Sequence, residues 1–325
     1  MRAMLCTEWG GPETLKLETI EPKRPGEGQI RIAIKAAGLN FADTLMIAGK
    51  YQDRPDFPFS PGLEAAGEVI ECGPGVSGLA PGTRVMAMLG HGGFAEEAIT
   101  TPERVFAIPD AMPYEEAAGF PVAYGTSHVA LRHRARLEAD ETLLVHGAAG
   151  GVRLTAVEIG TVMGATVIAS ASSPEKLALA KTYGARHGID TSKEDIRERV
   201  LEITGKAGAD VIYDPVGGDV FDTSLRCIAW EGRLLVIGFA AGRIPEAPAN
   251  YLLLKNCSAV GVFWGAYMKR NPAVIRRSFD ELLGWYAEGK LKPHVSETYG
   301  LADAAAAMKA MMARKTTGKI VVTMA

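Results

Sequence analysis

Hydrophobic and polar residues follow two different patterns along this chain, and the pattern changes near residue 120. Before that point, short runs that alternate between apolar and polar residues are broken by Gly and Pro, as in residues 29–37, 65–71 and 84–89. Alternation with a period of two is typical of half-buried strands. The first part of the chain is therefore predicted to be a β-rich domain.

Between residues 142 and 261, short apolar runs alternate with amphipathic stretches of helical length. This order calls for a parallel sheet covered by helices on both faces. The predicted strands are 143–146, 166–169, 188–190, 211–214 and 234–238, and the helices between them include 174–183 and 194–204. After Gly265 we expect helices over 272–288 and 301–312 and a strand over 319–323. The whole is an α/β protein with a doubly wound parallel sheet and a second, β-rich domain.

Composition narrows the class of protein. The 325 residues are enough for two domains with a core in each. A net charge of −3 provides no electrostatic footprint for nucleic acid or an anionic membrane. The N-terminus turns polar too soon for a signal peptide, and no apolar run reaches membrane-spanning length. We therefore expect a cytoplasmic protein without nucleic-acid or membrane partners. The cysteines, which we expect to be free thiols, lie far apart without CxxC spacing: Cys6, Cys72, Cys227 and Cys257.

A glycine-rich turn follows the predicted strand 143–146 and opens the next helix. Strand, glycine turn and helix in this order form the dinucleotide-binding arrangement, in which glycines let the backbone approach a pyrophosphate at the helix N-terminus. The alternative is a tight turn that binds nothing. The predicted cofactor contacts in this turn are Gly147, Ala149, Gly150, Gly151 and Val152.

The end of the next strand indicates which dinucleotide is bound. An enzyme that uses NAD usually places an acidic residue there, about twenty residues after the turn, to bind the ribose hydroxyls. This chain has Ser170, Ser172 and then Lys176. Hydroxyls and an ammonium would hold a 2′-phosphate, so NADPH is the predicted cofactor. The alternative for Lys176 is an ordinary exposed helix lysine.

Several stretches carry a resemblance to a known family. They include Pro61-Gly62-Leu63-Glu64-Ala65-Ala66-Gly67, residues 37–43, residues 213–218 and residues 249–256. Over nearly its whole length the chain resembles the zinc-independent medium-chain dehydrogenases/reductases, in particular the quinone oxidoreductase and zeta-crystallin group. The resemblance implies a GroES-like catalytic domain over 1–121, a Rossmann cofactor domain over 122–264 and a segment 265–325 that completes the catalytic domain.

The resemblance also implies roles for single residues. Lys176 and Arg314 match positions that contact the 2′-phosphate, whereas Thr191 stands where a tyrosine is usual. Thr126 would support the nicotinamide end of the cofactor, beside Gly238 and Phe239, and Phe239 would form an apolar wall. The residues implied to border the nicotinamide pocket are Asn40, Asp43 and Tyr51. For Asp43 a structural role in its loop is an equal alternative, and Tyr51 could simply lie on the surface.

Zinc members of this superfamily have a histidine where this chain has Leu63, and a cysteine near its Asn40. A catalytic zinc needs three protein ligands, which Leu and Asn cannot complete. The segment after Gly82 lacks the clustered cysteines of the structural zinc lobe as well. A site without metal suits an acceptor that needs little polarisation, such as a quinone or an activated double bond, better than a simple ketone.

Arg153 breaks the family pattern, which has a glycine at this point of the turn. A side chain there must either displace the helix or point along the phosphate groove. Its guanidinium could pair with the pyrophosphate, or its bulk could obstruct the site. Both outcomes remain open from the sequence.

Residues 257–263 alternate as a strand after the last Rossmann strand. An unpaired apolar edge invites a second chain, so we predict a homodimer that covers Val260, Val262 and Trp264. The leading functional hypothesis is an NADPH-dependent quinone reductase. An enone or enoyl reductase is the enzymatic alternative, and a non-catalytic NADPH-binding protein is the alternative of a different class.

Overall fold

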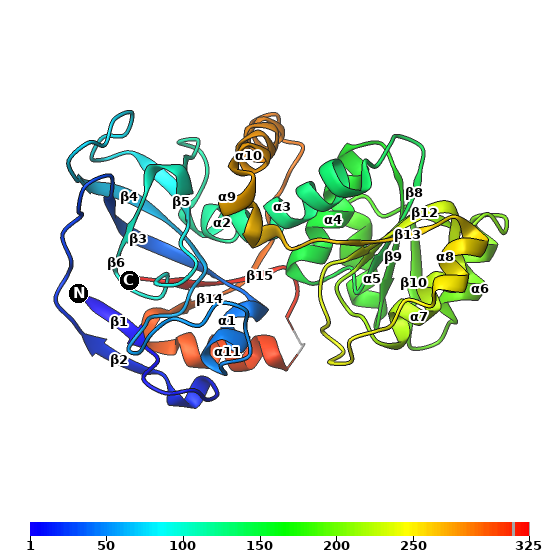
Figure 1. Ribbon diagram of the computed structural model, residues 1–325, viewed down its shortest axis with the longest axis horizontal. Coiled ribbons are helices and arrows are strands. Elements are labelled where there is room, and N and C mark those ends of the chain that lie inside the picture. The colour runs from blue at the N-terminus through cyan, green and yellow to red at the C-terminus, as the bar shows by residue number, and fades with distance from the viewer. Residues whose placement is uncertain (314–315, 325) are drawn as a thin grey trace. The chain divides into compact units, whose positions relative to one another are not determined.

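A computed structural model describes residues 1–313 and 316–324, and these residues form two compact units (Figure 1). Unit 1 consists of Met1–Val122 and Pro293–Ala325, and unit 2 consists of Ala123–Lys292. Unit 1 is therefore built from two segments that lie far apart in the sequence.

Unit 2 contains a six-stranded parallel sheet with the strand order β10-β9-β8-β11-β12-β13. This is the order of a doubly wound dinucleotide-binding fold, in which the chain reverses its winding direction between β8 and β11. The strands are β8 (Thr142–His146), β9 (Thr166–Ala171), β10 (His187–Asp190), β11 (Ala209–Asp214), β12 (Ile228–Val236) and β13 (Ser258–Gly261). The connecting helices are α4 (Gly151–Val162), α5 (Pro174–Thr182), α6 (Ile196–Ile203), α7 (Asp219–Cys227) and α8 (Ala249–Lys255).

The central strands of unit 2 are mostly apolar because helices cover both faces of the sheet. Each strand predicted between residues 142 and 261 is present, although β12 begins at Ile228 and ends at Val236, before Gly238. Directly after β12, the Ile237 N–H still donates to the Asp214 carbonyl of β11 at 3.0 Å.

The predicted boundary at residue 265 is wrong for residues 265–292, which belong to unit 2. They contain α9 (Tyr267–Arg270) and α10 (Pro272–Ala287). Helix α10 packs against the π-helix Val129–Ala135, which continues α3 (Phe120–His128). The buried His128 ring binds the Ser278 hydroxyl at 2.9 Å and the Glu281 carboxylate at 3.1 Å. These pairings join residues about 150 positions apart, so no local pattern could reveal them.

Unit 1 contains a seven-stranded sheet in the order β14-β15-β3-β4-β5-β7, with β6 paired to β3. Strand β15 lies antiparallel to β3, so the C-terminal segment completes a sheet begun by the N-terminal one. The strands of this unit are β1 (Arg2–Leu5), β2 (Lys16–Thr19), β3 (Ile30–Leu39), β4 (Glu64–Cys72), β5 (Arg84–Met88), β6 (Glu97–Thr100), β7 (Val105–Ala107), β14 (Val295–Gly300) and β15 (Lys319–Thr323). The helices are α1 (Phe41–Ile47), α2 (Tyr114–Ala118) and α11 (Ala304–Met312).

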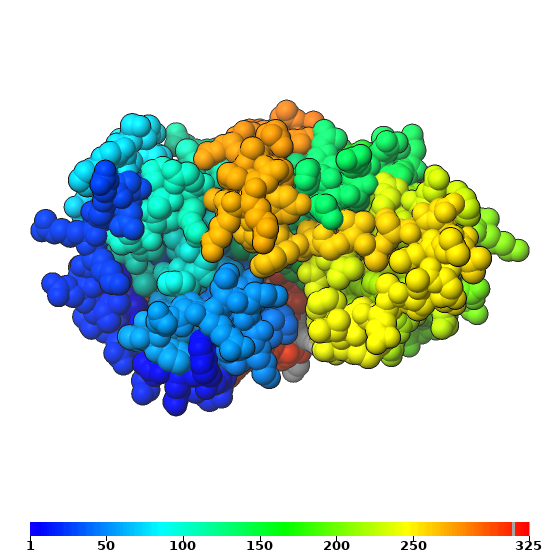
Figure 2. Space-filling view, viewed as in Figure 1, coloured from blue at the N-terminus to red at the C-terminus, as the bar shows by residue number. Residues whose placement is uncertain are grey.

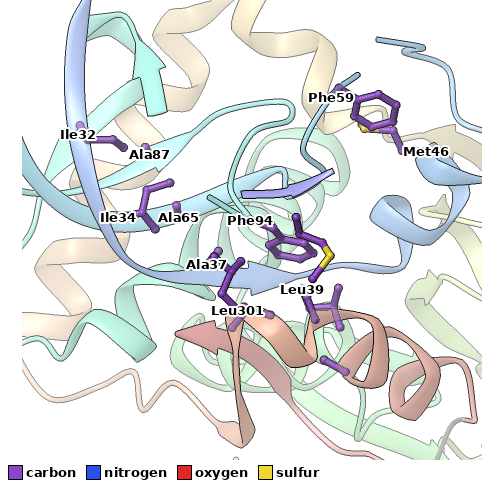
Figure 3. Close-up of a cluster of buried hydrophobic side chains, with 14 of the residues drawn as sticks. Ile32, Ile34, Ala37, Leu39, Met46, Phe59, Ala65, Ala87, Phe94 and Leu301 are labelled. Atoms are coloured by element: carbon purple, nitrogen blue, oxygen red, sulfur yellow. The ribbon is translucent and has the colours of Figure 1, made fainter. Parts of the chain in front are cut away.

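The core of unit 1 follows from the alternation along β3, where Ile30, Ile32 and Ile34 are buried. Figure 3 draws Leu301 of the C-terminal segment in the same buried cluster as Leu39 of β3. Burial of each such side chain stabilises the fold by roughly 1.5–3 kcal/mol. None of the helices within 1–313 and 316–324 is both long enough and apolar enough to cross a membrane.

Candidate cofactor and substrate sites

The glycine turn of unit 2 connects β8 to α4. Gly147 has φ +63°, a left-handed conformation that favours glycine, and Gly150 is the N-cap of α4. The Ala148 N–H donates to the Ser170 carbonyl at 2.9 Å, which ties the turn to β9. No side chain of the described residues caps α4, so the N–H groups of its first turn face the position where an anion is favoured.

Two buried polar clusters inside unit 2 hold this turn in place. In the first, the Ser127 hydroxyl donates to the Val152 carbonyl at 2.6 Å and lies 3.0 Å from the Tyr213 hydroxyl. In the second, His146 binds the Ser170 hydroxyl at 3.1 Å and the Ser224 hydroxyl at 2.8 Å. Burial lowers the pKa of His146 and raises the pKa of Tyr213, so both rings are neutral at physiological pH.

This arrangement corrects the assignment of Ser170 as a phosphate contact. Ser170 is only 2% exposed, and its hydroxyl is engaged with the His146 ring inside unit 2. Ser170 lies within β9, which is buried from Val167 to Ala171, whereas Ser172 follows the end of the strand and is exposed. Ser173 caps α5 by accepting from the Lys176 N–H at 3.4 Å.

Polar groups surround the carboxyl ends of β9 and β10. Exposed Ser172 follows β9, half-buried Lys176 lies in the first turn of α5, and the Thr191 hydroxyl donates to the Ala171 carbonyl at 3.2 Å. No carboxylate follows β9 directly, because residues 170–173 read Ser-Ala-Ser-Ser. Arg314, the other predicted phosphate contact, lies outside the described residues.

The loops after β11 and β12 lie at the same edge of the parallel sheet as the glycine turn. The Asp214 carboxylate accepts from the N–H groups of Val216 and Gly217 at 2.8 and 2.9 Å, and so shapes the first loop. The Ala241 N–H donates to the Val216 carbonyl at 2.9 Å and joins the second loop to it. Phe239, next to Gly238, is 41% exposed in this second loop.

The space over the glycine turn is bounded by the Arg153 side chain. A Cβ built on Gly147 or Gly150 would meet the Arg153 side chain first, at 3.3 and 3.2 Å, and not backbone. The space over the turn is therefore bounded by a flexible side chain. Thr126 is buried at 8% exposure on α3, beside Gly125, where a Cβ would lie 2.5 Å from the Trp264 ring. Gly125 thus allows α3 to approach Trp264 closely.

Unit 1 contains a buried polar network around the Lys319 ammonium group. Its Nζ donates to the Leu39 carbonyl at 2.9 Å, to Asn40 Oδ1 at 2.8 Å and to Glu64 Oε1 at 2.8 Å. Asn40 Nδ2 donates to Glu64 Oε1 at 2.8 Å and to the Gly38 carbonyl at 3.3 Å. The amide of Asn40 is therefore held by its buried neighbours on both sides.

Asp43 completes this network as the third residue of α1. Its Oδ2 accepts from the Asn40 N–H at 2.8 Å, and its Oδ1 accepts from the N–H groups of Gly62 and Leu63, both at 3.1 Å. Burial raises the pKa of the Asp43 carboxyl to about 7, against the opposing effect of these backbone donors and of Lys319. This geometry matches the structural alternative for Asp43, which links α1 to the segment before β4.

Tyr51 and Leu63 are both half-buried and pack against the core of unit 1. Burial raises the pKa of Tyr51, with smaller contributions from Asp53 and Asp43, so its hydroxyl stays protonated at neutral pH. Leu63 places an apolar side chain where the zinc members of the superfamily have a histidine. Across residues 1–313 and 316–324, no three His, Cys, Asp or Glu side chains are grouped so that they could hold a metal ion.

Sequence reasoning missed Glu64 and Lys319 as site residues. Glu64 stands in the motif that carried the resemblance, directly after Leu63, and Lys319 opens the last predicted strand. Both are charged residues within apolar stretches, which is a signal for a buried pair. Their partnership spans 255 residues and depends on the pairing of β15 with β3.

Comparisons with known proteins agree with this architecture. A family model described as "Alcohol dehydrogenase GroES-like domain" matches residues 26–110, and one described as "Zinc-binding dehydrogenase" matches residues 151–285. The chain is 43% identical over 324 residues to quinone oxidoreductase-like protein 2 homolog of Nematostella vectensis, covering 99% of this chain and 88% of that protein.

Two solved structures are similar over nearly the whole chain. A quinone oxidoreductase from Pseudomonas syringae pv. Tomato DC3000 has a TM-score of 0.93 at 34% identity, with 99% of each chain covered. The Escherichia coli quinone oxidoreductase complexed with NADPH has a TM-score of 0.92 at 29% identity, covering 99% of this chain and 100% of that one. The chain belongs to the medium-chain dehydrogenases/reductases and, within them, to the quinone oxidoreductase family.

We predict that Lys319→Ala lowers the free energy of unfolding by about 3–5 kcal/mol, because it leaves the Glu64 carboxylate buried without its cation. Lys309→Ala, at an exposed position on α11, is the matched control and should change stability by less than about 0.5 kcal/mol. Urea unfolding measures both.

A double variant tests whether the pairing itself is responsible. Lys319→Met combined with Glu64→Gln removes both charges, so it should lose less stability than the Lys319→Ala variant. Equal loss in the two variants would show that the lost packing, and not the unpaired charge, determines the effect.

Proposed function

We propose that this protein is an NADPH-dependent quinone reductase that transfers hydride directly, without a metal. The observation that carries the proposal is the carboxyl edge of the unit 2 sheet. A glycine turn follows β8 there, and serine and lysine, instead of an acid, follow β9. The names of the relatives, and the NADPH in the Escherichia coli structure, support the same reading.

In this proposal the backbone of the glycine turn, which includes Ala149, Gly151 and Val152, receives the pyrophosphate. Ser172 and Lys176 receive the 2′-phosphate, and Arg314 is proposed as a further contact from the family resemblance. Thr126 and Gly238 support the nicotinamide end, and Phe239 offers an apolar wall to a flat acceptor. NADPH supplies the hydride when bound.

Asn40 and Asp43 are proposed to act as positioning residues, because their side chains are engaged within the Lys319 network. They hold α1 and the segment that leads to Tyr51. Water or the protonated Tyr51 hydroxyl delivers the proton that follows the hydride. The contribution of the protein is then mainly the positioning of cofactor and acceptor.

The chemistry of the side chains in unit 1 supports the proposed metal-free mechanism. Leu63 offers no ligand atom, and the Asn40 amide oxygen accepts from the Lys319 ammonium. A cation that is already bonded to Asn40 disfavours a second cation at that position. A quinone accepts hydride without a Lewis acid more readily than a simple ketone does.

We further propose that the protein is a cytoplasmic homodimer, consistent with its four free cysteines. Strand β13 is the last strand of its sheet, and α8 exposes Leu253 at 76% and Leu254 at 72%. Figure 2 shows the yellow segment that contains α8 at the visible surface of unit 2. Phe263 is 53% exposed as well.

Val262 and Trp264 do not belong to the proposed interface. Val262 and Trp264 are only 8% and 7% exposed, so the chain itself covers them and they need no partner. The apolar surface available to a second chain consists instead of Phe263 and the two leucines of α8. A free strand edge next to such a surface is a favourable dimer contact.

We expect the purified protein to oxidise NADPH with 1,4-benzoquinone as acceptor, equally well before and after dialysis against EDTA. Cyclohexanone should not be reduced. Absorbance at the NADPH band measures the oxidation of NADPH in each of these assays: benzoquinone before dialysis, benzoquinone after dialysis, and cyclohexanone. Turnover with 2-cyclohexenone but not with the quinone would favour the enone reductase. NADPH binding without turnover of any acceptor would favour the non-catalytic binding protein.

Lys176→Ala should weaken NADPH binding roughly tenfold and leave NADH binding unchanged, because only NADPH carries the 2′-phosphate. Lys181→Ala, in the last turn of the same helix, is the control and should change neither affinity. Fluorescence titration measures each dissociation constant. If Lys176→Ala weakened the binding of NADPH and NADH equally, this would contradict a role of Lys176 at the 2′-phosphate.

Sedimentation equilibrium should give twice the 34.5 kDa of one chain. Leu254→Asp should shift the protein toward the monomer, since it places a charge on the proposed apolar interface. Leu17→Asp, at an apolar residue exposed on β2 of unit 1, should leave the mass unchanged. A monomeric wild type would refute the proposed assembly.

A further inference from the structure

Arg153 occupies the third position of α4, and its side chain lies back over the glycine turn. A Cβ on Gly150 would lie 3.2 Å from Arg153 Nη1 and 3.3 Å from its Cδ, and a Cβ on Gly147 would lie 3.3 Å from the same Cδ. Side chains in an α-helix point toward its N-terminus, so a long residue at this position covers the turn that precedes it. The guanidinium group is therefore placed where a pyrophosphate would approach the backbone.

The position of this charge opposes the electrostatics of the helix. The N-terminus of a helix carries a partial positive charge, which favours anions and disfavours cations. Arg153 adds a full positive charge there; burial is the main cause of the lowered pKa of His146, and the Arg153 charge lowers it further. Two sources of positive potential thus converge on one turn. A ligand with two adjacent negative groups would interact favourably with both.

The hydrogen bonds of α4 are regular at the bulky residue in its third position. The Leu154 N–H donates to the Gly150 carbonyl at 2.8 Å, so the ladder of α4 begins directly at its N-cap. The atoms of Arg153 that lie over the glycines belong to the outer part of its side chain. A bound anion can be accommodated by rotation of that side chain, without movement of the backbone.

We infer that Arg153 pairs with the pyrophosphate of the bound dinucleotide and sets its affinity without discriminating between NADPH and NADH. This inference rests on the proposed dinucleotide binding in unit 2. A planar guanidinium can donate two parallel hydrogen bonds to phosphate oxygens. Cofactor choice and cofactor affinity are then assigned to different residues, the first to Lys176 and the second to Arg153.

The test compares three ligands in titrations of the full-length protein. NADPH, NADH and ADP-ribose all contain the pyrophosphate, whereas only NADPH has the 2′-phosphate and ADP-ribose lacks the nicotinamide. Arg153→Gln should weaken binding of all three by a similar factor, roughly tenfold. It should also reduce the dependence of each dissociation constant on salt concentration. Arg153→Lys should bind with intermediate affinity.

Controls separate this role from effects on folding. Arg186→Gln removes an exposed arginine directly before β10, at the amino ends of the strands and so at the opposite end from the glycine turn. This variant should change none of the three affinities. Circular dichroism and the melting temperature without ligand should be the same for Arg153→Gln and the wild type.

Two results would overturn the inference while leaving the proposed function intact. If Arg153→Gly or Arg153→Gln binds the dinucleotides more tightly than the wild type, the side chain obstructs the site. If Arg153→Gly and Arg153→Gln bind the dinucleotides as tightly as the wild type does, Arg153 makes no contact with the ligand. A wild type that binds none of the three ligands would refute the proposed function together with this inference.

Discussion

The buried ion pair between Lys319 and Glu64 is the interaction on which unit 1 depends. An ammonium group buried at 8% exposure requires a nearby carboxylate, and Glu64 Oε1 lies 2.8 Å from it. The pair connects β15 with β4 across β3, so the C-terminal segment must pair in one register. The same ammonium orients Asn40, which together with Asp43 determines how α1 leaves the sheet. The Lys319 charge therefore links the pairing of β15 to the positions of Asn40 and Asp43 in the proposed substrate site.

Unit 2 follows a different constraint, the parallel direction of its strands. Because all six strands run the same way, their carboxyl ends meet at one edge, and the glycine turn, Ser172 and Gly238 come to that edge from separate parts of the sequence. The neutral, hydrogen-bonded His146 and Tyr213 support the turn from within the unit. Buried hydrogen bonds thus support the glycine turn on one side, and the Arg153 side chain lies over it on the other.

Local patterns predicted most of the elements in both units. The strand predicted over 319–323 coincides with β15, and the helix predicted over 174–183 differs from α5 by one residue. The errors concern relations between distant segments. Residues 265–292 pack on the π-helix of unit 2, Ser170 faces His146, and Val262 and Trp264 are covered by their own chain. Each depends on which face of an element is covered, and periodicity alone does not show what covers it.

The sequence by itself determined the class of the fold, the position of the glycine turn and the lack of an acid after β9, because these depend on residue type and short spacing. Tertiary structure decided the rest. It brought Lys319 to Glu64 over 255 residues, bound the amide of Asn40 in a buried network and placed Arg153 over the glycines. Hydrogen bonds and ion pairs act over a few ångströms, and only the folded sheet determines which distant residues come that close.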